Sequence, residues 1–546
     1  MTIQTRLVYN SPRDYGLPHN EWRPGQFDLL KKCQNAINNG GGFIFASAPT
    51  GTGKSGVPAA LSCETNVLVL VHTLGLLDQY ERVYGFDIVK GMQEYKCVHP
   101  QKVYSWRQRG VVPLASDCHL TNMRDCSSAS KCPYLVAREK ALSSNKAACT
   151  YRYAILSEEM QKRGGCLVMD ECHSSSDEIL EFSEFKITEE DIKSFGLPPF
   201  PVYGYGKDGK GDLLDNKTKN IIIAWLAGCI ARVNIMDVST ILTPEGSRAK
   251  RMYKYLTSGL NLITESDGLF LFCGARVIEK NLFGKRTQNQ LVIKPIDSKI
   301  IAQKLYEQKD FVLLMSATIG NVKPLADELG ISNYTFYDYP HPVPKEKRPV
   351  YNLGVTPMTK INLDAIPGLY RTQAVIIAKW IESLNNDWRG IVLTTSNFKV
   401  KILRDNLRTI LGDRIYNPKS PSVSQRIKDF IEDKRKGLIA VDTIQGWGTG
   451  IDLSWDLARF SVIAGVPFSN PADTYNNVRI SRPGGRSYDL WSTYNTIPQA
   501  CGRTSRGEYT NGEYLLNVSA LADNNAISSI AMNYYPSWFK ESIINE

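Results

Sequence analysis

A turn of small residues near the start of the chain has the composition of a phosphate-binding loop. Residues 48–55 read Ala-Pro-Thr-Gly-Thr-Gly-Lys-Ser and follow the apolar run 42–46. In such a turn, backbone N–H groups point into a triphosphate, a lysine neutralises the outer phosphates and a hydroxyl binds Mg²⁺. Ala48 stands where the strict pattern has glycine, so the match is to a relaxed form of the pattern. The predicted nucleotide-binding residues of this turn are Pro49, Thr50, Gly51, Thr52, Gly53, Lys54 and Ser55.

An acidic pair, Asp170 and Glu171, follows another apolar run at residues 165–169. Hydrolysis of a nucleoside triphosphate needs one carboxylate that helps to hold Mg²⁺ and another that orients the attacking water. An acidic pair alone is more often a solvated turn, but a phosphate-binding turn in the same chain favours the catalytic interpretation. We therefore predict that Ser55 and Asp170 bind Mg²⁺ and that Glu171 orients water.

Three further stretches carry residue types that could act on the same nucleotide. Residues 316–318, Ser-Ala-Thr, offer small hydroxyl groups that could relay movement between two halves of the protein. Residues 446–452 form a glycine-rich stretch whose backbone can approach a ligand closely. Residues 499–506 hold two arginines three positions apart, hence on one face of a helix, where both could reach a transferring phosphate. In the last two of these stretches, the residues predicted to act on the nucleotide are Asp452, Gln499, Arg503 and Arg506.

The elements that position these residues are short apolar runs. Each run is four to six residues long and rich in β-branched residues, as expected for strands buried on both faces of a parallel sheet. The runs predict two α/β domains, one in each half of the chain. They lie at residues 43–46, 66–71, 165–169 and 311–315, and again at 390–394, 437–441 and 461–465.

Composition limits the class of protein. The chain has 546 residues with a net charge of +10, and this sign weakly favours a polyanionic partner. No run of about 18 apolar residues is present, and the first residues lack the apolar core of a signal peptide. We expect an intracellular protein without a membrane partner, located in the cytoplasm of a bacterial or virus-infected cell, with a nuclear location left open.

Four cysteines lie between the phosphate-binding turn and the acidic pair, at Cys97, Cys118, Cys126 and Cys132. Their spacing contains no C-x-x-C pair, and four thiolates suit structural Zn²⁺ as well as an iron-sulfur cluster. From spacing alone, zinc, a cluster and unliganded cysteines all remain open. The other eight cysteines of the twelve lie among apolar residues and are predicted to fill the core.

The order of the motifs resembles that of the superfamily 2 helicases: A-P-T-G-T-G-K-S, D-E-C-H, S-A-T, G-x-G-x-D and Q-A-x-G-R-x-x-R. Cys172 replaces the alanine of the D-E-A-H box, and Gln26 resembles the glutamine on the adenine side of these motors. Residues 71–79 keep only the threonine and the glutamine of the next family motif, which leaves a DNA contact there in doubt. The four cysteines and the C-P-Y-x-x-A-R ending at residues 132–138 are similar to XPD/DinG-like helicases.

This resemblance implies an α/β fold with two RecA-like motor domains that have parallel sheets, an iron-sulfur cluster domain and a mainly helical Arch-like insertion in the first motor domain. Motor domain 1 would comprise residues 1–95, 136–174 and 306–345, and motor domain 2 residues 346–546. The cluster domain would span residues 96–135 and the Arch-like insertion residues 175–305. The implied cofactors are ATP, Mg²⁺ and a 4Fe-4S cluster held by Cys97, Cys118, Cys126 and Cys132. The implied catalytic set is Lys54, Asp170, Glu171, Gln499, Arg503 and Arg506.

The resemblance also implies an ATP-dependent DNA helicase that moves 5'-to-3' on single-stranded DNA and opens forked or tailed duplexes. A monomer is expected, and no protein partner is predicted. Residues 247–255 mix basic and aromatic side chains that could contact a single strand, although a solvated basic helix face explains them as well. Two alternatives stay open: a translocase or remodeller that does not separate strands, and a nucleotide-regulated DNA-binding protein.

Overall fold

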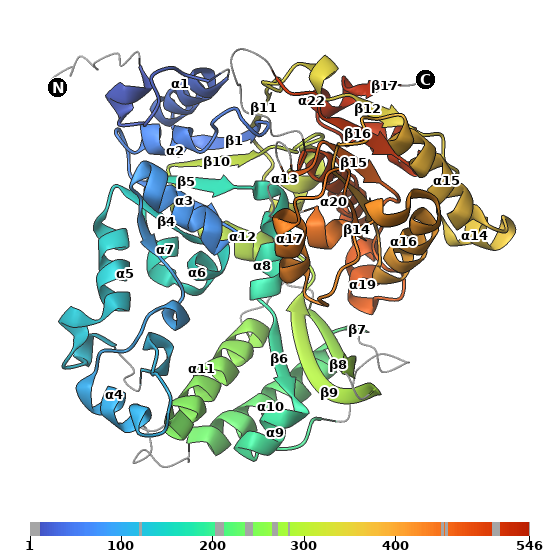
Figure 1. The fold of residues 1–546 in the computed structure, drawn as a ribbon. Coiled ribbons are helices and arrows are strands. Elements are labelled where there is room, and N and C mark those ends of the chain that lie inside the picture. Colours follow the sequence, from blue (N-terminus) through green and yellow to red (C-terminus); the bar gives the residue numbers. More distant parts are fainter. Residues whose placement is uncertain are drawn as a thin grey trace.

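The computed structural model of the chain describes residues 11–23, 25–118, 123–201, 212–234, 244–264, 271–281, 284–448, 453, 457–504 and 514–544. Two parallel sheets with helices on their faces form the upper part of the molecule in Figure 1, and a smaller antiparallel sheet with helices lies below them. The predicted α/β class with two RecA-like domains is confirmed. No helix in the described parts of the chain is long and apolar enough to cross a membrane.

The first RecA-like domain is built on a parallel sheet of seven strands in the order β11-β1-β10-β5-β2-β4-β3. The apolar runs predicted from the sequence form β1, β2, β5 and β10, whereas β3, β4 and β11 were not predicted as strands. The strands are β1 (Gly42–Ser47), β2 (Val67–Val71), β3 (Asp87–Val89), β4 (Lys146–Thr150), β5 (Cys166–Asp170), β10 (Phe311–Ser316) and β11 (Thr335–Asp338).

Register brings the motifs of this domain to one edge of the sheet. Ser47 of β1 lies opposite Ser316 of β10, and Asp170 of β5 lies opposite Met315 of β10. Because all seven strands run in the same direction, their carboxyl ends meet at one edge. The phosphate-binding turn, the acidic pair and residues 316–318 all follow these strand ends.

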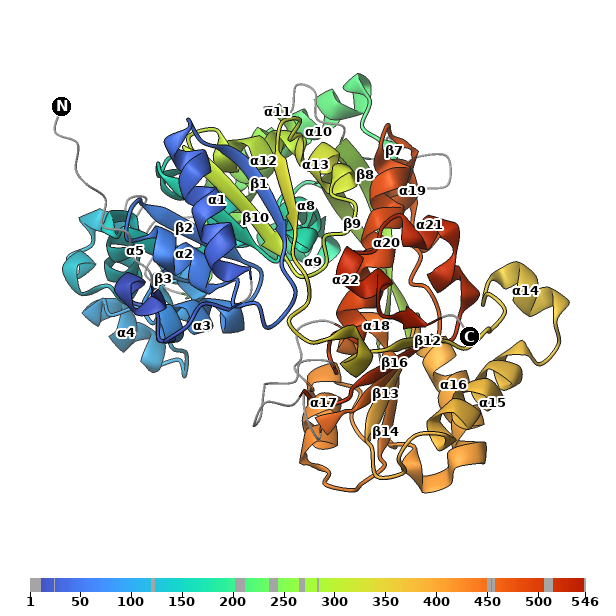
Figure 2. The ribbon, with the colours of Figure 1, turned by 90° about the horizontal axis from the view of Figure 1, so that it is seen from above.

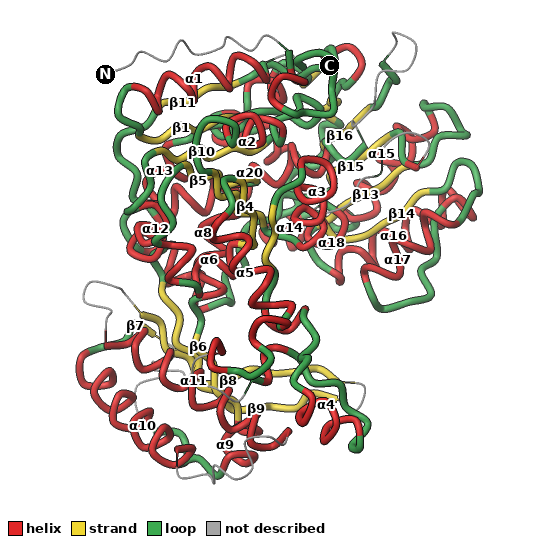
Figure 3. Tube along the Cα trace, turned by 90° about the vertical axis from the view of Figure 1, so that its left-hand side faces the viewer, coloured by secondary structure: helices red, strands yellow, loops and turns green. Residues whose placement is uncertain are grey.

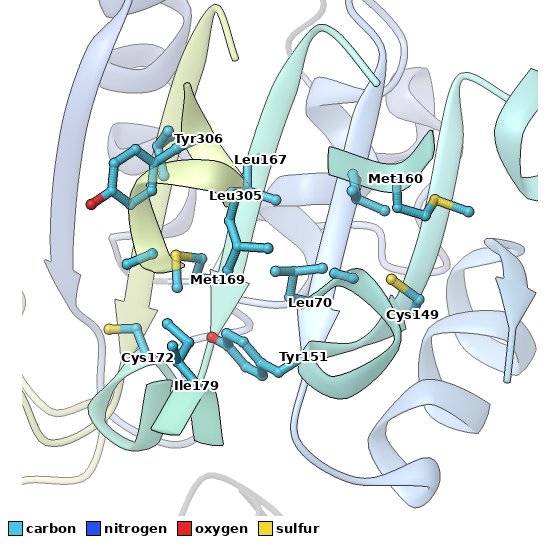
Figure 4. Close-up of a cluster of buried hydrophobic side chains, with 14 of the residues drawn as sticks. Leu70, Cys149, Tyr151, Met160, Leu167, Met169, Cys172, Ile179, Leu305 and Tyr306 are labelled. Atoms are coloured by element: carbon cyan, nitrogen blue, oxygen red, sulfur yellow. The ribbon is translucent and has the colours of Figure 1, made fainter. Parts of the chain in front are cut away.

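Helices cover both faces of this sheet. Leu68 and Leu70 of β2 belong to one buried cluster, and Val67, Val69 and Val71 belong to the cluster on the opposite face. Figure 4 shows part of the first cluster, where Leu70 of β2 lies with Tyr151 and Ile179 of the covering helices. The helices are α1 (Gln26–Asn38), α2 (Gly56–Leu61), α3 (Leu74–Tyr84), α5 (Pro133–Ser143), α6 (Tyr151–Leu156), α7 (Glu158–Gln161), α8 (Ser175–Phe182), α12 (Lys299–Tyr306) and α13 (Lys323–Leu329).

The second RecA-like domain is built on a parallel sheet of six strands in the order β14-β13-β15-β16-β12-β17. Its strands are β12 (Val350–Asn352), β13 (Gly390–Thr394), β14 (Ile439–Thr443), β15 (Phe460–Ile463), β16 (Val518–Leu521) and β17 (Ile543–Ile544). Its helices are α14 (Lys360–Ala365), α15 (Leu369–Glu382), α16 (Asn397–Leu411), α17 (Val423–Glu432), α18 (Ile444–Trp447), α19 (Thr474–Ser481), α20 (Gly485–Cys501), α21 (Ser529–Met532) and α22 (Ser537–Lys540). Seen from above, the two RecA-like domains are separate bodies that lie against each other (Figure 2).

The segment between β5 and β10 forms the lower body, which we call the insertion (residues 185–295; Figure 3). The predicted helical spacing at residues 221–233 lies within α10 (Asn216–Asn234), between α9 (Glu189–Phe195) and α11 (Pro244–Thr264). A four-stranded antiparallel sheet, in the order β6-β9-β8-β7, was not predicted. Its strands are β6 (Phe185–Thr188), β7 (Asp212–Leu213), β8 (Leu271–Asn281) and β9 (Gly284–Pro295). The insertion therefore combines helices with a sheet.

The segment that carries the four cysteines, residues 92–132, consists of short turns around α4 (Pro100–Arg107). It lies beside α11 of the insertion in Figure 1. An ion pair joins the cysteine-carrying segment to the insertion, between Arg251 of α11 and the carboxylate of the buried Asp117. The cysteine segment is thus held between the first RecA-like domain and the insertion.

Candidate nucleotide-binding and catalytic site

The turn after β1 has the backbone geometry that a phosphate-binding loop needs. Gly51 and Gly53 have φ angles of +91° and +74°, in the left-handed region where any side chain other than that of glycine is strained. The hydroxyl of Thr52 donates to the carbonyl of Pro49 at 2.8 Å and closes the turn. A Cβ atom on Gly53 would also lie only 3.0 Å from the side chains of Arg23 and Gln26. Both the backbone angle and the space therefore require glycine at this position.

Gln26, predicted to lie on the adenine side of the nucleotide, contacts the turn itself. Its amide donates to the carbonyl of Gly53 at 2.8 Å, and its side-chain oxygen accepts the backbone N–H of Arg23 at 3.2 Å. Arg23 in turn donates to the carbonyl of Gly51 at 3.2 Å. Gln26 is 2% exposed, so this contact is part of the core. Residues 23–26 thus support the turn from the side of α1.

The acidic pair lies directly across from the turn. The ammonium group of Lys54 bonds to Oε1 of Glu171 at 2.8 Å, although the two residues are 117 positions apart in the sequence. Burial alone would raise the pKa of Glu171, but the charges of Lys54 and His173 outweigh burial and hold this pKa well below its usual range. Glu171 also has a φ of +50° and is the only non-glycine residue with positive φ among those the structure describes. Such local strain is typical of functional sites.

Asp170 is buried at the end of β5, and burial raises its pKa to about 6. Its Oδ2 accepts the phenol of Tyr80 at 2.9 Å, and its Oδ1 accepts the backbone N–H of Glu171 at 2.9 Å. Ser55, the other predicted Mg²⁺ ligand, lies close enough to the same phenol to lower its pKa. Asp170 and Ser55, which carry the chemistry of a magnesium site, therefore both lie near Tyr80.

A histidine and a serine complete the surroundings of Glu171. Ser316 donates to Oε2 of Glu171 at 3.2 Å, and Nδ1 of His173 lies 2.7 Å from the same serine hydroxyl and 3.4 Å from Oε2. Oε2 of Glu171 thus faces His173 and Ser316 while Oε1 faces Lys54. The geometry fixes the direction of a carboxylate that would orient a water molecule.

Residues 317 and 318 connect this edge to the second RecA-like domain. Gln499 of α20 donates to the hydroxyl of Thr318 at 3.0 Å, and the indole of Trp538 in α22 donates to the carbonyl of Ala317 at 3.0 Å. Within this stretch, Ser316 thus contacts Glu171, and Ala317 and Thr318 contact the second domain. This is the arrangement that the predicted relay between the halves requires.

Of the two predicted arginines, Arg503 and Arg506, the structure describes only Arg503. Helix α20 ends at Cys501, so Arg503 lies beyond the helix, and the predicted arrangement of both arginines on one helical face is wrong for this residue. Arg503 donates to the carbonyl of Gly448 at 2.9 Å. The pKa of His72 is lowered by burial and by the nearby charges of His173, Arg503 and Lys54, which places Arg503 at the edge that carries the turn. Arg506 and Asp452 lie outside the described residues.

Two family models match the chain, one in each half. The model of the res subunit of type III restriction enzymes matches residues 19–197, and that of a helicase C-terminal domain matches residues 383–535. No curated protein matches the sequence. Among solved structures, one entitled "XPD_Helicase" has a TM-score of 0.56 with 16% identity, over 98% of this chain and 100% of that one. The family models are thus those of a restriction-enzyme res subunit and of a helicase C-terminal domain, and the fold is similar to that of a solved XPD helicase.

Two further solved structures support this fold. "Structure of S. tokodaii Xpd4" has a TM-score of 0.56 with 16% identity, over 95% of this chain and 99% of that one. "XPD_APO" has a TM-score of 0.52 with 15% identity, over 93% of this chain and 98% of that one. The likeness extends over nearly the whole length of each chain, so it includes the insertion and the cysteine segment as well as the two motor sheets.

Three of the four cysteines influence one buried lysine. The pKa of Lys102 is lowered by burial and raised by the thiols of Cys97, Cys118 and Cys126. Burial raises the pKa of the Cys97 thiol, and the charges of Cys118 and Cys132 raise it further. None of the four forms a disulfide bond. Among the described residues, no three His, Cys, Asp or Glu side chains are close enough together to hold a single metal ion.

Sequence reasoning missed several residues of the nucleotide site, among them Arg23, His72 and Tyr80. Tyr80 directly follows Gln79, the last residue of the stretch that resembles the next family motif, so its position was the available signal. His72 lies in the same stretch. Nothing in the spacing indicates that the side chain of Tyr80 turns inward to the end of β5, because only the packing of α3 on the sheet decides that.

Proposed function

We propose that this protein is a helicase that hydrolyses ATP between its two RecA-like domains to move 5'-to-3' along single-stranded DNA, and that it opens forked or tailed duplexes. One observation carries the proposal: Lys54 bonds to Glu171 at one edge of the first sheet, and Gln499 of the second domain bonds to Thr318 at the same edge. A lysine for phosphate, a carboxylate for water and an arginine from the other domain are the groups that phosphoryl transfer needs.

Each side chain has a role in the proposed reaction. Lys54 neutralises the outer phosphates, Ser55 and Asp170 hold Mg²⁺, and Glu171 orients the attacking water. Arg503, together with Arg506, stabilises the charge of the transition state from the second domain, and Asp452 contacts the nucleotide there. Gln499 already links the two domains through Thr318. Because the catalytic groups come from both domains, hydrolysis requires the domains to close, and closure is the step that moves DNA.

A cavity supports single-stranded DNA as the partner. It has a volume of about 660 Å³ and lies between the first RecA-like domain, the cysteine segment and α11 of the insertion. Its lining includes the aromatic rings of Tyr134 and Tyr153 and several cationic side chains. The cationic residues are Arg124, Arg138, Arg152 and Lys254. Cationic groups that follow a phosphate backbone, together with flat side chains, are what proteins use to bind single strands.

The proposal follows the division into domains that the family resemblance implies, with the insertion narrowed to residues 185–295 because α8 and α12 cover the first sheet, and it includes a 4Fe-4S cluster in residues 96–135. The thiols of Cys97, Cys118 and Cys126 influence the pKa of the buried Lys102, and those of Cys118 and Cys132 influence the pKa of Cys97, which supports a common site for the four thiolates that a cluster needs. When bound, such a cluster would crosslink the turns of a segment that has little regular structure. Purified protein should be brown and contain iron and acid-labile sulfide, and a preparation that contains only zinc would contradict this part.

ATP hydrolysis tests the nucleotide site. The ATPase rate should rise with single-stranded DNA and fall to background in Lys54→Ala and Glu171→Gln. Glu158→Gln is a matched control, because Glu158 pairs with Lys162 on the surface of the same domain, and its rate should equal that of the wild type. Unchanged hydrolysis in Lys54→Ala would show that the site is assigned wrongly.

Strand displacement separates the three functional alternatives. A helicase opens duplexes with a 5' single-stranded tail and leaves those with a 3' tail intact. A translocase hydrolyses ATP in response to DNA but opens neither substrate. A nucleotide-regulated DNA-binding protein binds DNA in a manner that depends on ATP, without turnover.

A further inference from the structure

Tyr80 occupies a position that none of the proposed catalytic steps uses. The residue lies on α3, its side chain is fully buried, and its ring packs edge-on against Phe86 with 5.3 Å between ring centroids. Its phenol donates to Oδ2 of Asp170 at 2.9 Å. The phenol therefore contacts the side chain of one of the two residues that are proposed to bind Mg²⁺.

Tyr80 is one of two hydrogen-bond donors to the buried carboxylate of Asp170. A buried carboxylate needs such donors, because an unsatisfied charge in the interior is costly. The backbone N–H of Glu171 supplies the second donor, to Oδ1 of Asp170 at 2.9 Å.

These two donors fix the plane of the Asp170 carboxylate. Each of its oxygens accepts one hydrogen bond and keeps a further lone pair for a ligand. Mg²⁺ demands near-ideal octahedral geometry, so a carboxylate that is already oriented binds it with less reorganisation. In other metal sites, loss of an outer hydrogen-bond partner of a ligand lowers metal affinity by about 10- to 100-fold.

We propose that Tyr80 is a positioning residue that orients Asp170 for Mg²⁺. It acts through the carboxylate of Asp170 and does not touch the nucleotide. The inference rests on the proposed ATP hydrolysis at this site and adds a determinant of its metal dependence.

The variant Tyr80→Phe removes the hydroxyl and keeps the ring. The test is the affinity for Mg²⁺, measured by titration calorimetry on protein that holds a non-hydrolysable ATP analogue, together with the Mg²⁺ dependence of the ATPase. We expect the Mg²⁺ concentration for half-maximal rate to rise by about tenfold or more, as loss of an outer partner does elsewhere. The rate at saturating Mg²⁺ should stay within a few-fold of the wild type, because the metal ligands themselves remain. A loss of maximal rate with unchanged Mg²⁺ dependence would overturn the proposal.

Tyr151→Phe is the matched control. Tyr151 is also a fully buried tyrosine, but its phenol donates to the backbone carbonyl of Asp170 at 3.1 Å rather than to the carboxylate. It lies in the core beside Met169 and Ile179, as Figure 4 shows. This variant loses a comparable hydroxyl, so any general loss of stability appears in it as well. A shift in Mg²⁺ dependence as large as that of Tyr80→Phe would mean that the effect is only structural.

A second variant keeps the proposal testable if Tyr80→Phe does not fold. Phe86→Leu loosens the packing of the Tyr80 ring and leaves its hydroxyl in place, so the Mg²⁺ requirement should rise by a smaller factor, and no rise would overturn the proposal. Wild-type protein that does not hydrolyse ATP with Mg²⁺ would remove the proposed function and this inference together. Wild-type hydrolysis with an unchanged Tyr80→Phe would remove only the role of Tyr80.

Discussion

A buried carboxylate holds the two RecA-like domains together on the side of the insertion. Glu328 of α13 is 3% exposed, and its Oε1 accepts hydrogen bonds from Nη2 of Arg479 at 3.0 Å and from the hydroxyl of Ser176 at 2.9 Å. Its Oε2 accepts Nη2 of Arg482. Both arginines belong to the second domain, and Arg479 also bonds to Asp177 at 2.7 Å. The substitution Glu328→Gln keeps the shape of the side chain and removes the charge that the arginines share.

The expected cost follows from the burial of all three groups. Removal of one partner from a buried ion pair costs about 3–5 kcal/mol, because the remaining charge is left in the interior. Arg479 and Arg482 keep partial partners in Asp177 and Asp297, so we expect the lower end of this range. About 3 kcal/mol changes the ratio of associated to separated domains more than a hundredfold.

The assay must report on association of the domains rather than on one global transition, since chains with several domains do not unfold in two states. We would follow proteolysis in the connection between the sheets, residues 339–349, together with thermal unfolding. In Glu328→Gln this connection should be cut faster, and the domains should unfold in separate steps. Asp327→Asn is the control, because the neighbouring Asp327 pairs with Lys323 on the surface at 2.7 Å and should have little effect. Equal behaviour of the two variants would refute the reasoning.

Two more predictions concern the same interface. Gly320→Ala should separate the domains and slow DNA-stimulated ATP hydrolysis, because the new Cβ atom would lie 1.9 Å from the carbonyl oxygen of Tyr534; Gly75→Ala, which meets no atom within 4 Å, should not. Burial lowers the pKa of His341 from 6.5 to about 3, so the unfolded chain takes up a proton that the folded chain does not. Stability should therefore fall as the pH drops from about 6.5 towards about 3, and His341→Gln should show a flatter pH profile in thermal unfolding.

Much of the motor could be predicted from sequence because its signals are local. The apolar runs that became β1, β2, β5 and β10 are buried on both faces, so their composition alone marks them as strands. Short strands such as β11 and β17 carry polar or exposed residues and lack that signal. The hairpin of β8 and β9 also could not be predicted from the sequence, because its charged and polar residues follow no clear period. These two strands form through their pairing with each other, which no local pattern indicates.

The sequence by itself determined which chemical groups are present: a glycine turn with Lys54 and Ser55, the acidic pair, and arginines near the end of the chain. It also predicted that the first of these groups follow strands of a parallel sheet. These properties depend on neighbouring residues, which is why they can be recognised without a structure.

Only the tertiary structure decided which groups meet. Lys54 contacts Glu171 because β1 and β5 both pair with β10 and end at the same edge. Arg503 reaches that edge only because the second domain packs against residues 317 and 318, and its position beyond the end of α20 breaks the helical spacing that its sequence suggests. Contacts between distant segments depend on sheet order and on the packing of domains, and a single sequence specifies neither through any local pattern.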